Sequence, residues 1–419
     1  MNTGLRGAVA ILAVASPCLA AADAAPSSLD PVVVTGSRVD HGSFDLPGAV
    51  DVVDAGRIGA DNARVNVSEA LAAVPGITVQ NRQNYAQDLQ ISSRGFGARA
   101  AFGVRGIRLI SDGIPASMPD GQGQAATFNL DRAARMEVMR GPMSAIYGNH
   151  SGGVIQLFTV DGEDPPSVEA RVAAGSYGTW KTDLAAQGRA VEVGYVLDAS
   201  RFATDGYRQH SAADRDQGLA KLTHAPDGET RVMLIANGFS QQALDPQGTT
   251  WKRFTTDPRS VEEAALLYNT RKSIDQLQGG ASYERRFGED IVQIMAYAGQ
   301  RSVTQYQSIP RALQLITSST PANDPRRRQS GGVIDFDRDF SGLSARWIGH
   351  YELGGGRLTA TVGLDYERAS DDRRGYENFI GQTLGVKGAL GRDVVNSGSS
   401  CDQYVQAEWL MGQWSVTGG

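Results

Sequence analysis

The stretch from Arg357 to Arg368 reads RLTATVGLDYER and alternates apolar and polar residues with a period of two. Successive side chains of a β-strand point to opposite faces, so this period sorts the residues into two faces. The apolar face is predicted to hold Leu358, Ala360, Val362, Leu364 and Tyr366. The polar face is predicted to hold Arg357, Thr359, Thr361, Gly363, Asp365 and Glu367. We therefore predict a strand well beyond the roughly five to six residues typical of globular sheets.

Similar alternation recurs from residue 166 onward, for example at Val191–Ser200. By this criterion we count roughly ten or eleven strands, each long enough to cross a bilayer at a tilt. Tight connections are predicted at Gly175–Gly178, Pro226–Gly228 and Gly288–Asp290, and long ones near 241–270, 306–328 and 369–400. Short turns on one side and long loops on the other favour an antiparallel transmembrane β-barrel. A soluble sandwich or propeller is the alternative.

Upstream of these strands, residues 46–160 predict one modest mixed α/β domain. Asn66-Val-Ser-Glu69 resembles a capping box with Asn in place of Ser or Thr, which predicts a short helix through Ala73 that Pro75-Gly76 ends. Strands are predicted at Ile77–Gln80, Gln90–Ser93, Arg108–Ser111, Glu137–Arg140 and Val154–Thr159, with a helical turn at Ser144–Tyr147. The pattern changes at Asp161–Pro166, so we place the domain boundary there.

The first 22 residues have the composition of a secretory signal peptide. Arg6 supplies a positive start, Ala8–Ala15 is a short apolar core, and Ala20–Ala22 offers a small-residue cleavage site. The β-branched run Val32–Thr35 further on predicts a short strand. Because no hairpin signal adjoins it, we expect it to pair with another chain by strand addition. A tail or an ordinary edge strand is the alternative.

Composition and motifs exclude several classes of protein. A formal net charge of -6 gives no clustered basic surface for nucleic acid, so no nucleic-acid partner is expected. The five histidines lack metal-ligand spacing, and Gly95–Ala100 matches a dinucleotide fingerprint only superficially, without the following helix. We expect no catalytic residues, no metal and no cofactor. Cys401 is the one cysteine left after signal-peptide removal, either a free thiol or half of a disulfide.

Several segments, taken in order, resemble the TonB-dependent outer-membrane receptor family, and the resemblance covers essentially the whole chain. The segment Asp30-Pro31-Val32-Val33-Val34-Thr35 looks like the family's TonB box. Six further segments are similar to its plug domain: Ser68–Gln80, Ser93–Phe96, Leu109–Pro115, Glu137–Pro142, Tyr147–Gly148 and Gly152–Gln156. The segment Pro115–Gln124 resembles members that handle ferric citrate-type complexes.

The resemblance implies a periplasmic segment (23–45) with the TonB box (29–35), a plug domain (46–160) and a transmembrane barrel (166–419). It also implies energised import of a scarce nutrient, such as a ferric siderophore or ferric citrate-type complex. The implied partners are TonB, outer-membrane lipid and the iron chelate.

Under this resemblance the substrate is expected at the plug apices Asn81–Asp88 and Ala116–Gln124. The candidate ligand-binding residues are Arg99, Arg105, Asp120, Gln122 and Gln124. Hydrogen bonding to the inner wall is an equally open role for each of these arginines. The residues expected to form ion pairs between plug and barrel wall are Arg94, Glu137 and Arg140.

The C-terminal end departs from the family pattern. A barrel that holds a plug needs about 22 strands, roughly twice the number predicted here. The final run Ser415–Gly419 lacks the aromatic last residue that the family uses for membrane assembly. We therefore expect the first half of a barrel, inactive alone because an open edge in lipid leaves backbone groups unpaired. Cys401 would then be half of a loop disulfide. The alternative function is a passive porin or β-barrel adhesin.

Overall fold

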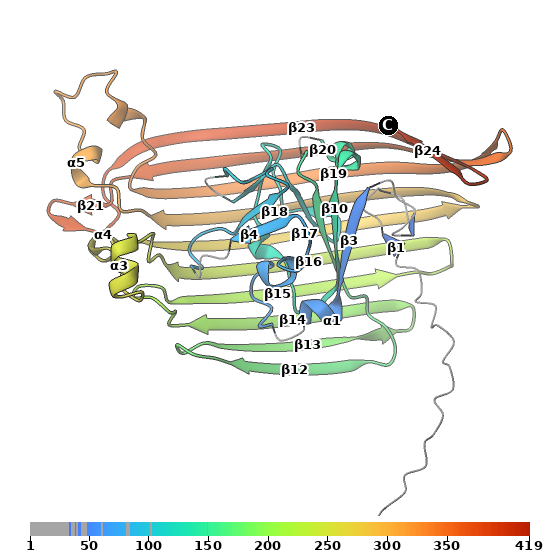
Figure 1. The fold of residues 1–419 in the computed structure, drawn as a ribbon, viewed down its shortest axis with the longest axis horizontal. Coiled ribbons are helices and arrows are strands. Elements are labelled where there is room, and N and C mark those ends of the chain that lie inside the picture. The colour runs from blue at the N-terminus through green and yellow to red at the C-terminus, as the bar shows by residue number, and fades with distance from the viewer. Residues whose placement is uncertain are drawn as a thin grey trace, which may run out of the picture.

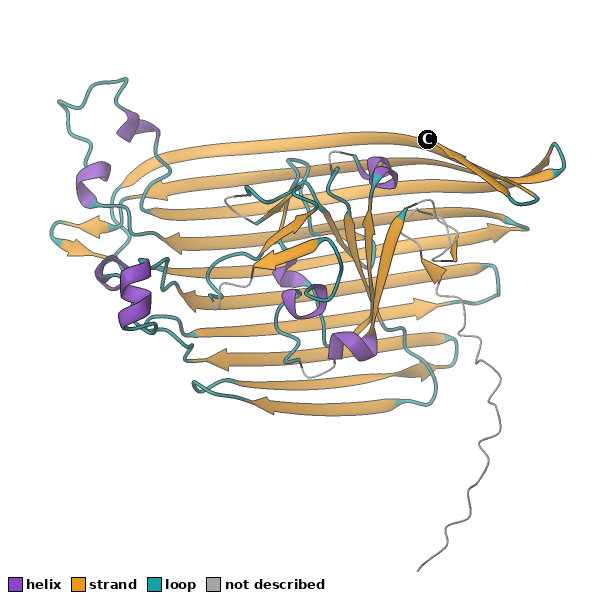
Figure 2. Cartoon of the chain, in the orientation of Figure 1, coloured by secondary structure: helices purple, strands orange, loops and turns teal. Residues whose placement is uncertain are grey.

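The computed structural model describes residues 33–34, 38, 41–42, 48–59, 62–80, 84–100, 103–148 and 150–419. A small domain lies against one face of a large sheet of long strands (Figure 1). Colouring by secondary structure shows that strands dominate both parts and that helices are few and short (Figure 2). In the described part of the chain, no helix is both long and apolar enough to cross a membrane.

The large sheet, here called the wall sheet, has eleven antiparallel strands, nearly all paired with their neighbours in sequence. They are β12 (Ser167–Ala174), β13 (Trp180–Ala190), β14 (Val193–Thr204), β15 (Ala213–His224), β16 (Thr230–Leu244), β17 (Arg271–Phe287), β18 (Asp290–Tyr306), β19 (Val333–Leu353), β20 (Gly356–Tyr376), β23 (Leu390–Met411) and β24 (Trp414–Gly418). The predicted number of strands, ten or eleven, is confirmed, as is their antiparallel order.

The alternation predicted for residues 357–368 is confirmed in β20. Val362, Leu364 and Tyr366 are 44%, 40% and 43% exposed on the outer face of the wall sheet. Thr361 and Glu367, on the opposite face, are buried beneath the small domain. β20 therefore carries apolar side chains outward and polar ones toward the small domain, the alternation seen in strands of outer-membrane barrels.

Connections differ in length between the two ends of the wall sheet, because antiparallel neighbours alternate ends. One end has only short connections: 191–192, 225–229, 288–289, 354–355 and 412–413. The other, here called the long-loop end, has 175–179, 205–212, 245–270, 307–332 and 377–389. It carries α3 (Trp251–Thr256), α4 (Glu263–Leu267), α5 (Arg311–Gln314), η3 (Pro325–Arg328), β21 (Phe379–Ile380) and β22 (Thr383–Leu384) (Figure 1, left).

Two predictions about these connections were wrong. The tight turn at Gly175–Gly178 lies at the long-loop end rather than with the other short turns. The predicted loop 369–400 is mostly strand, since β20 continues to Tyr376 and β23 starts at Leu390. Ladder hydrogen bonds need no apolar side chains, so a polar run beyond the alternating segment still extends the strand.

The small domain coincides with the predicted plug domain and is called that below. Its elements are β3 (Ala49–Asp54), α1 (Ala55–Gly59), α2 (Ser68–Leu71), β4 (Ile77–Gln80), β5 (Gln90–Ser93), β6 (Val104–Arg105), β7 (Arg108–Ser111), β8 (Ile114–Pro115), β9 (Gln122–Gly123), η1 (Ala125–Thr127), β10 (Ala133–Arg140), η2 (Pro142–Tyr147) and β11 (Val154–Thr159). All five predicted strands and the predicted helical turn are present.

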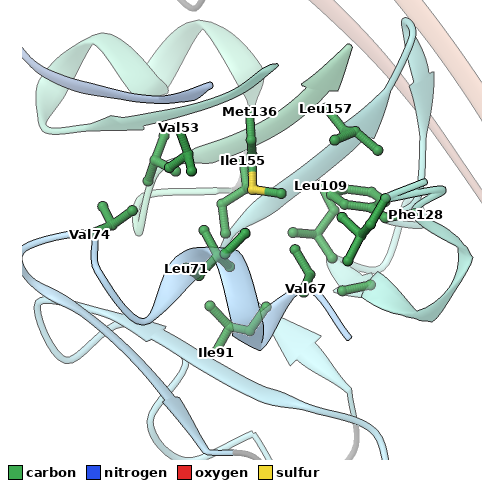
Figure 3. Close-up of a cluster of buried hydrophobic side chains, with 14 of the residues drawn as sticks. Val53, Val67, Leu71, Val74, Ile91, Leu109, Phe128, Met136, Ile155 and Leu157 are labelled. Atoms are coloured by element: carbon green, nitrogen blue, oxygen red, sulfur yellow. The ribbon is translucent and has the colours of Figure 1, made fainter. Parts of the chain in front are cut away.

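The core of the plug domain forms between a five-stranded sheet, β3-β10-β11-β7-β8, and the short helix α2. Leu71 and Val67, at and just before α2, meet Met136, Ile155 and Leu157 from the sheet (Figure 3). Each of these side chains is at most 1% exposed. The plug domain thus has its own hydrophobic core.

The capping-box prediction was half correct. Glu69 accepts hydrogen bonds from backbone N–H groups as expected, including that of Asn66 at 2.8 Å. The Asn66 side chain does not cap α2, which begins after Val67 without a side-chain cap. Its Oδ1 accepts instead from Arg215 Nη2 of the wall at 3.4 Å. The Asn66 side chain therefore makes a tertiary contact with the wall instead of the local capping contact that the sequence predicts.

The predicted strand at Val32–Thr35 is seen at Val33–Val34 (β1), which pairs antiparallel with His41–Gly42 (β2). In this single chain its partner is the chain itself, and the expected pairing with another chain stays a prediction. The other TonB-box residues Asp30, Pro31, Val32 and Thr35 lie outside the described residues, as does the predicted signal peptide. Cys401 is a free, exposed thiol within β23, not in a loop as predicted.

Candidate functional site at the plug–wall interface

A buried ion-pair network joins the start of β10 to two strands of the wall. Arg132 of the plug lies 3.1 Å from Asp183 Oδ1 and 3.3 Å from Asp198 Oδ2. A second pair has the opposite polarity: Nζ of Lys181, on β13 of the wall, lies 2.6 Å from Asp131 Oδ2 of the plug domain. The three carboxylates lie within 4.8 Å of one another. Such crowding of like charges is sustained by the two cations, so removing either cation would leave an uncompensated buried charge.

A second ion pair joins β7 to β20, and a buried histidine lies near it. The Arg108 guanidinium donates two hydrogen bonds to the Glu367 carboxylate, and Tyr297 donates a third from 3.3 Å. His150 Nδ1 lies 3.0 Å from the Tyr147 carbonyl oxygen, and its Nε2 has no partner among the described residues. Burial, together with the charge of Arg108, lowers the pKa of His150 to about 4.

Arg38, a few residues after the predicted TonB box, is clamped between plug and wall. Its guanidinium stacks 4.2 Å from the ring centroids of both Tyr147 and Tyr404. It donates to Asp365 Oδ2 at 2.6 Å, to the Tyr404 hydroxyl at 3.0 Å and to the Ile146 carbonyl at 3.2 Å. A guanidinium offers both a flat face for stacking and a fork of donors, and this site uses both.

One predicted apex of the plug domain is pinned to the long-loop end of the wall. Asp245, just after β16, accepts from Asn84 Nδ2 at 2.6 Å and from Gln87 Nε2. Lys272 of β17 lies 3.1 Å from Asp88 Oδ2. The segment 84–88 therefore forms the rim where plug and wall meet.

A cavity of about 800 Å³ opens at this rim, between the segment 84–88 and the long loops. Its lining is dominated by carboxamides and hydroxyls, with one acid and one arginine: Asn84, Gln87, Arg208, Asp245, Gln247, Gly248, Gln305, Tyr306, Gln307, Ser308, Ile309, Pro310 and Leu313. Arg208 donates to the backbone carbonyls of Gln247 and Ser260, so its donors are engaged by protein groups. The cavity offers many hydrogen-bonding groups but little net charge.

The structure separates the five predicted ligand-binding residues. Arg105 and Asp120 lie 3.8 Å apart in an exposed ion pair on the plug surface, and Arg99 is also exposed. Gln124 accepts from Arg301 of β18 and donates to Asp88, so it is a plug–wall contact. None of the five lines the cavity at the rim.

The contacts described for the three residues predicted to form ion pairs with the wall lie within the plug domain. Arg140 binds Asp51 within the plug domain, and Glu137 accepts from Arg135 at 2.8 Å, also within it. Arg94 is exposed, and its backbone N–H donates to Gly76 O. Both Arg140 and Glu137 lie on a central strand of the domain, β10, whose partners are its own neighbours β3 and β11.

Sequence reasoning missed the residues that do join plug and wall, chiefly Arg38, Arg108, Arg132 and Lys181. It also missed Lys221 of β15, whose Nζ lies 3.2 Å from Asp112 Oδ1 of the plug domain. One signal was available: Asp365 and Glu367 occupy the polar face of the first strand predicted. Charges on the inner face of a barrel strand require partners, and the partners here are Arg38 and Arg108. Pairing across more than 250 residues cannot be assigned from periodicity.

Comparison with known proteins agrees with this architecture. Residues 43–154 match the TonB-dependent receptor plug domain. The chain is 31% identical over 400 residues to a hemin receptor of Yersinia pestis, covering 87% of this chain and 57% of that protein. It is 23% identical over 397 residues to a hemin receptor of Yersinia enterocolitica, covering 86% and 56%.

Among solved structures, the fold resembles the unliganded ferric citrate transporter, with a TM-score of 0.73 at 20% identity. That match covers 93% of this chain and 58% of the transporter. The chain thus spans little more than half the length of the proteins it matches. With a plug domain, an outward-apolar antiparallel sheet and this similarity along nearly its whole length, the chain belongs to the TonB-dependent receptor family.

Proposed function

We propose that this chain forms part of an outer-membrane receptor that imports a ferric siderophore or ferric citrate-type complex with energy from TonB. The main support is a folded plug domain held by buried ion pairs against the inner face of a barrel-type sheet. A passive porin or adhesin would gain nothing from such a domain. A domain that fills the lumen is compatible with transport only if an energy source displaces it when substrate is bound.

The proposed roles of the N-terminal segments follow from their order. Residues 1–22 direct export, and residues 29–35 present the TonB box to the periplasm. Strand addition by TonB would compete with the pairing of Val33–Val34 against His41–Gly42. The next described contact along the chain is the Arg38 clamp, which a pull on the box would strain first.

An iron chelate is the favoured nutrient for two reasons. The two relatives are named hemin receptors, and the fold resembles a ferric citrate transporter. The cavity at the rim lies at the long-loop end, where substrate arrives in such receptors, and its volume suits a small chelate.

The test measures uptake of ⁵⁵Fe-labelled ferric citrate and ferric siderophores. The cells express this gene and no other receptor of this family. Val33→Pro removes a backbone donor from the box and is expected to abolish uptake while leaving surface binding intact. Val33→Thr, which keeps the backbone, is the matched control and is expected to transport normally. Uptake that survives both Val33→Pro and a protonophore would overturn energised import in favour of a passive pore.

A further inference from the structure

Three arginines lie on the inner face of the wall sheet near its long-loop end: Arg338 of β19, Arg373 of β20 and Arg392 of β23. Their orientation follows from strand alternation, because Phe340, Glu367 and Tyr404, an even number of residues away, are buried on that face. Phe336 is opposite Arg373, and Gly375 is opposite Arg392. Arg373 and Arg392 are therefore diagonal neighbours on the adjacent strands β20 and β23.

Their positive charge exceeds the negative charge around them. Arg338 forms a two-pronged ion pair with Asp371, donating from Nε at 2.5 Å and from Nη2 at 2.6 Å. The charged groups facing Arg373 are Arg392, Asp371 and Arg338. In the described part of the chain, neither Arg373 nor Arg392 has an ion pair or hydrogen bond to its side chain. The group thus holds three cations against one carboxylate.

The arginines lie at the same level of the wall as the cavity at the rim. Gln305, which lines the cavity, is opposite Ile334; Ile334 is opposite Gly375; and Gly375 is opposite Arg392. Strands are spaced about 4.8 Å apart, so three steps place Arg392 roughly 14 Å from Gln305 along the inner face. A ligand at the cavity would have the arginines beside it.

We propose that Arg373 and Arg392 form an anion-binding subsite that selects a negatively charged ferric chelate over a neutral one. This inference rests on the proposed function and names its substrate class. Two half-buried guanidinium groups that find no counter-ion among the described residues repel each other, and an incoming carboxylate or catecholate removes that repulsion while accepting forked hydrogen bonds. The hydrogen-bonding cavity next to them holds the rest of the chelate.

The adjacent residue supplies a matched control. Arg374 points to the outer face, where it lies 2.5 Å from Asp372 Oδ2 and 3.9 Å from Asp393. Arg373→Gln and Arg374→Gln therefore make the same chemical change at neighbouring positions on opposite faces. Only the first is expected to alter ligand binding.

The experiment measures equilibrium binding to outer-membrane vesicles that contain the protein as its gene makes it. The probes are ferric citrate, a triply negative ferric triscatecholate and a neutral ferric trihydroxamate. We expect the unsubstituted protein to favour an anionic probe and to lose affinity as ionic strength rises. Arg373→Gln/Arg392→Gln should weaken anionic binding about tenfold or more and flatten that salt dependence, whereas Arg374→Gln should do neither.

Three outcomes would overturn the subsite. One is unchanged anionic binding in the double variant, and another is an equal effect of Arg374→Gln. The third is binding of the neutral probe alone, which would leave the receptor function standing with a different ligand class. Binding of none of the three probes by the unsubstituted protein would instead overturn the proposed import of ferric chelates, and the subsite with it.

Discussion

His150 shows how a single buried residue ties the plug–wall contact to pH. Its ring is 3% exposed, lies near the Arg108–Glu367 pair and titrates at about 4 rather than at 6.5. The unfolded chain takes up a proton as pH falls through 6.5, whereas the folded protein does not until about 4. Folding stability from His150 is therefore complete above pH 6.5 and falls progressively between 6.5 and 4.

We predict that lowering the pH from 7.5 to 5 costs about 2 kcal/mol of stability through His150 alone. Denaturant midpoints of the detergent-solubilised protein at the two pH values measure this loss. His150→Gln should remove that part of the pH dependence, whereas His224→Gln, at an exposed site, should leave it in place. An unchanged pH dependence in His150→Gln would show that other groups carry it.

Pairs of adjacent strands in the wall support the plug contacts through a repeated glycine–tyrosine arrangement. The Tyr404 ring lies over Gly363, its cross-strand partner, and the Tyr297 ring lies over Gly342 in the same way. A side chain at either glycine would overlap the ring. Each tyrosine hydroxyl then hydrogen-bonds a member of an ion pair: that of Tyr404 accepts from Arg38, and that of Tyr297 donates to Glu367. Glycine is needed here for close approach, not for a turn.

We predict that Gly363→Ala displaces Tyr404, weakens the Arg38 clamp and destabilises the protein by about 1–3 kcal/mol. Gly398→Ala is the control, because a Cβ added to that glycine of β23 meets nothing within 4 Å. Chemical denaturation followed by circular dichroism compares the two. Equal stability of both variants would mean that the ring is not held by the glycine.

At the scale of the whole molecule, plug and wall are joined by buried ion pairs and by small apolar clusters, such as the one that Ile114 forms with wall residues. The plug domain has its own apolar core, and several of its buried charges, among them Asp131 and Arg132, find partners on the wall. Such an interface is costly to break one partner at a time, since each broken pair leaves a buried charge. Displacing the plug domain from the wall would therefore have to break such pairs or begin with a local release at the rim.

The rim contact at Asp245 is the place to test local release. We predict that Asp245→Ala frees the segment 84–88, because both Asn84 and Gln87 lose their acceptor. Hydrogen–deuterium exchange in that segment should rise about tenfold or more, equivalent to a loss of roughly 1.4 kcal/mol of protection. Asp275→Ala is the control, because this carboxylate lies on the outer face and accepts from Ser240 of the wall at 2.7 Å; exchange in the segment 84–88 should stay unchanged.

Most elements of this protein could be predicted from its sequence, but the continuation of β20 and β23 into 369–400 could not. Alternation at 357–368, the turn glycines and the short plug strands specify local conformation and the face each residue occupies, since both depend on near neighbours. The tertiary structure alone decided which charges meet. Arg140 pairs with Asp51 inside the plug domain, and the Asn66 side chain contacts Arg215 instead of capping α2. Asp365 pairs with Arg38, which is 327 residues away in the sequence. Periodicity gives a side chain its face, but its partner depends on how two separately folded surfaces come together.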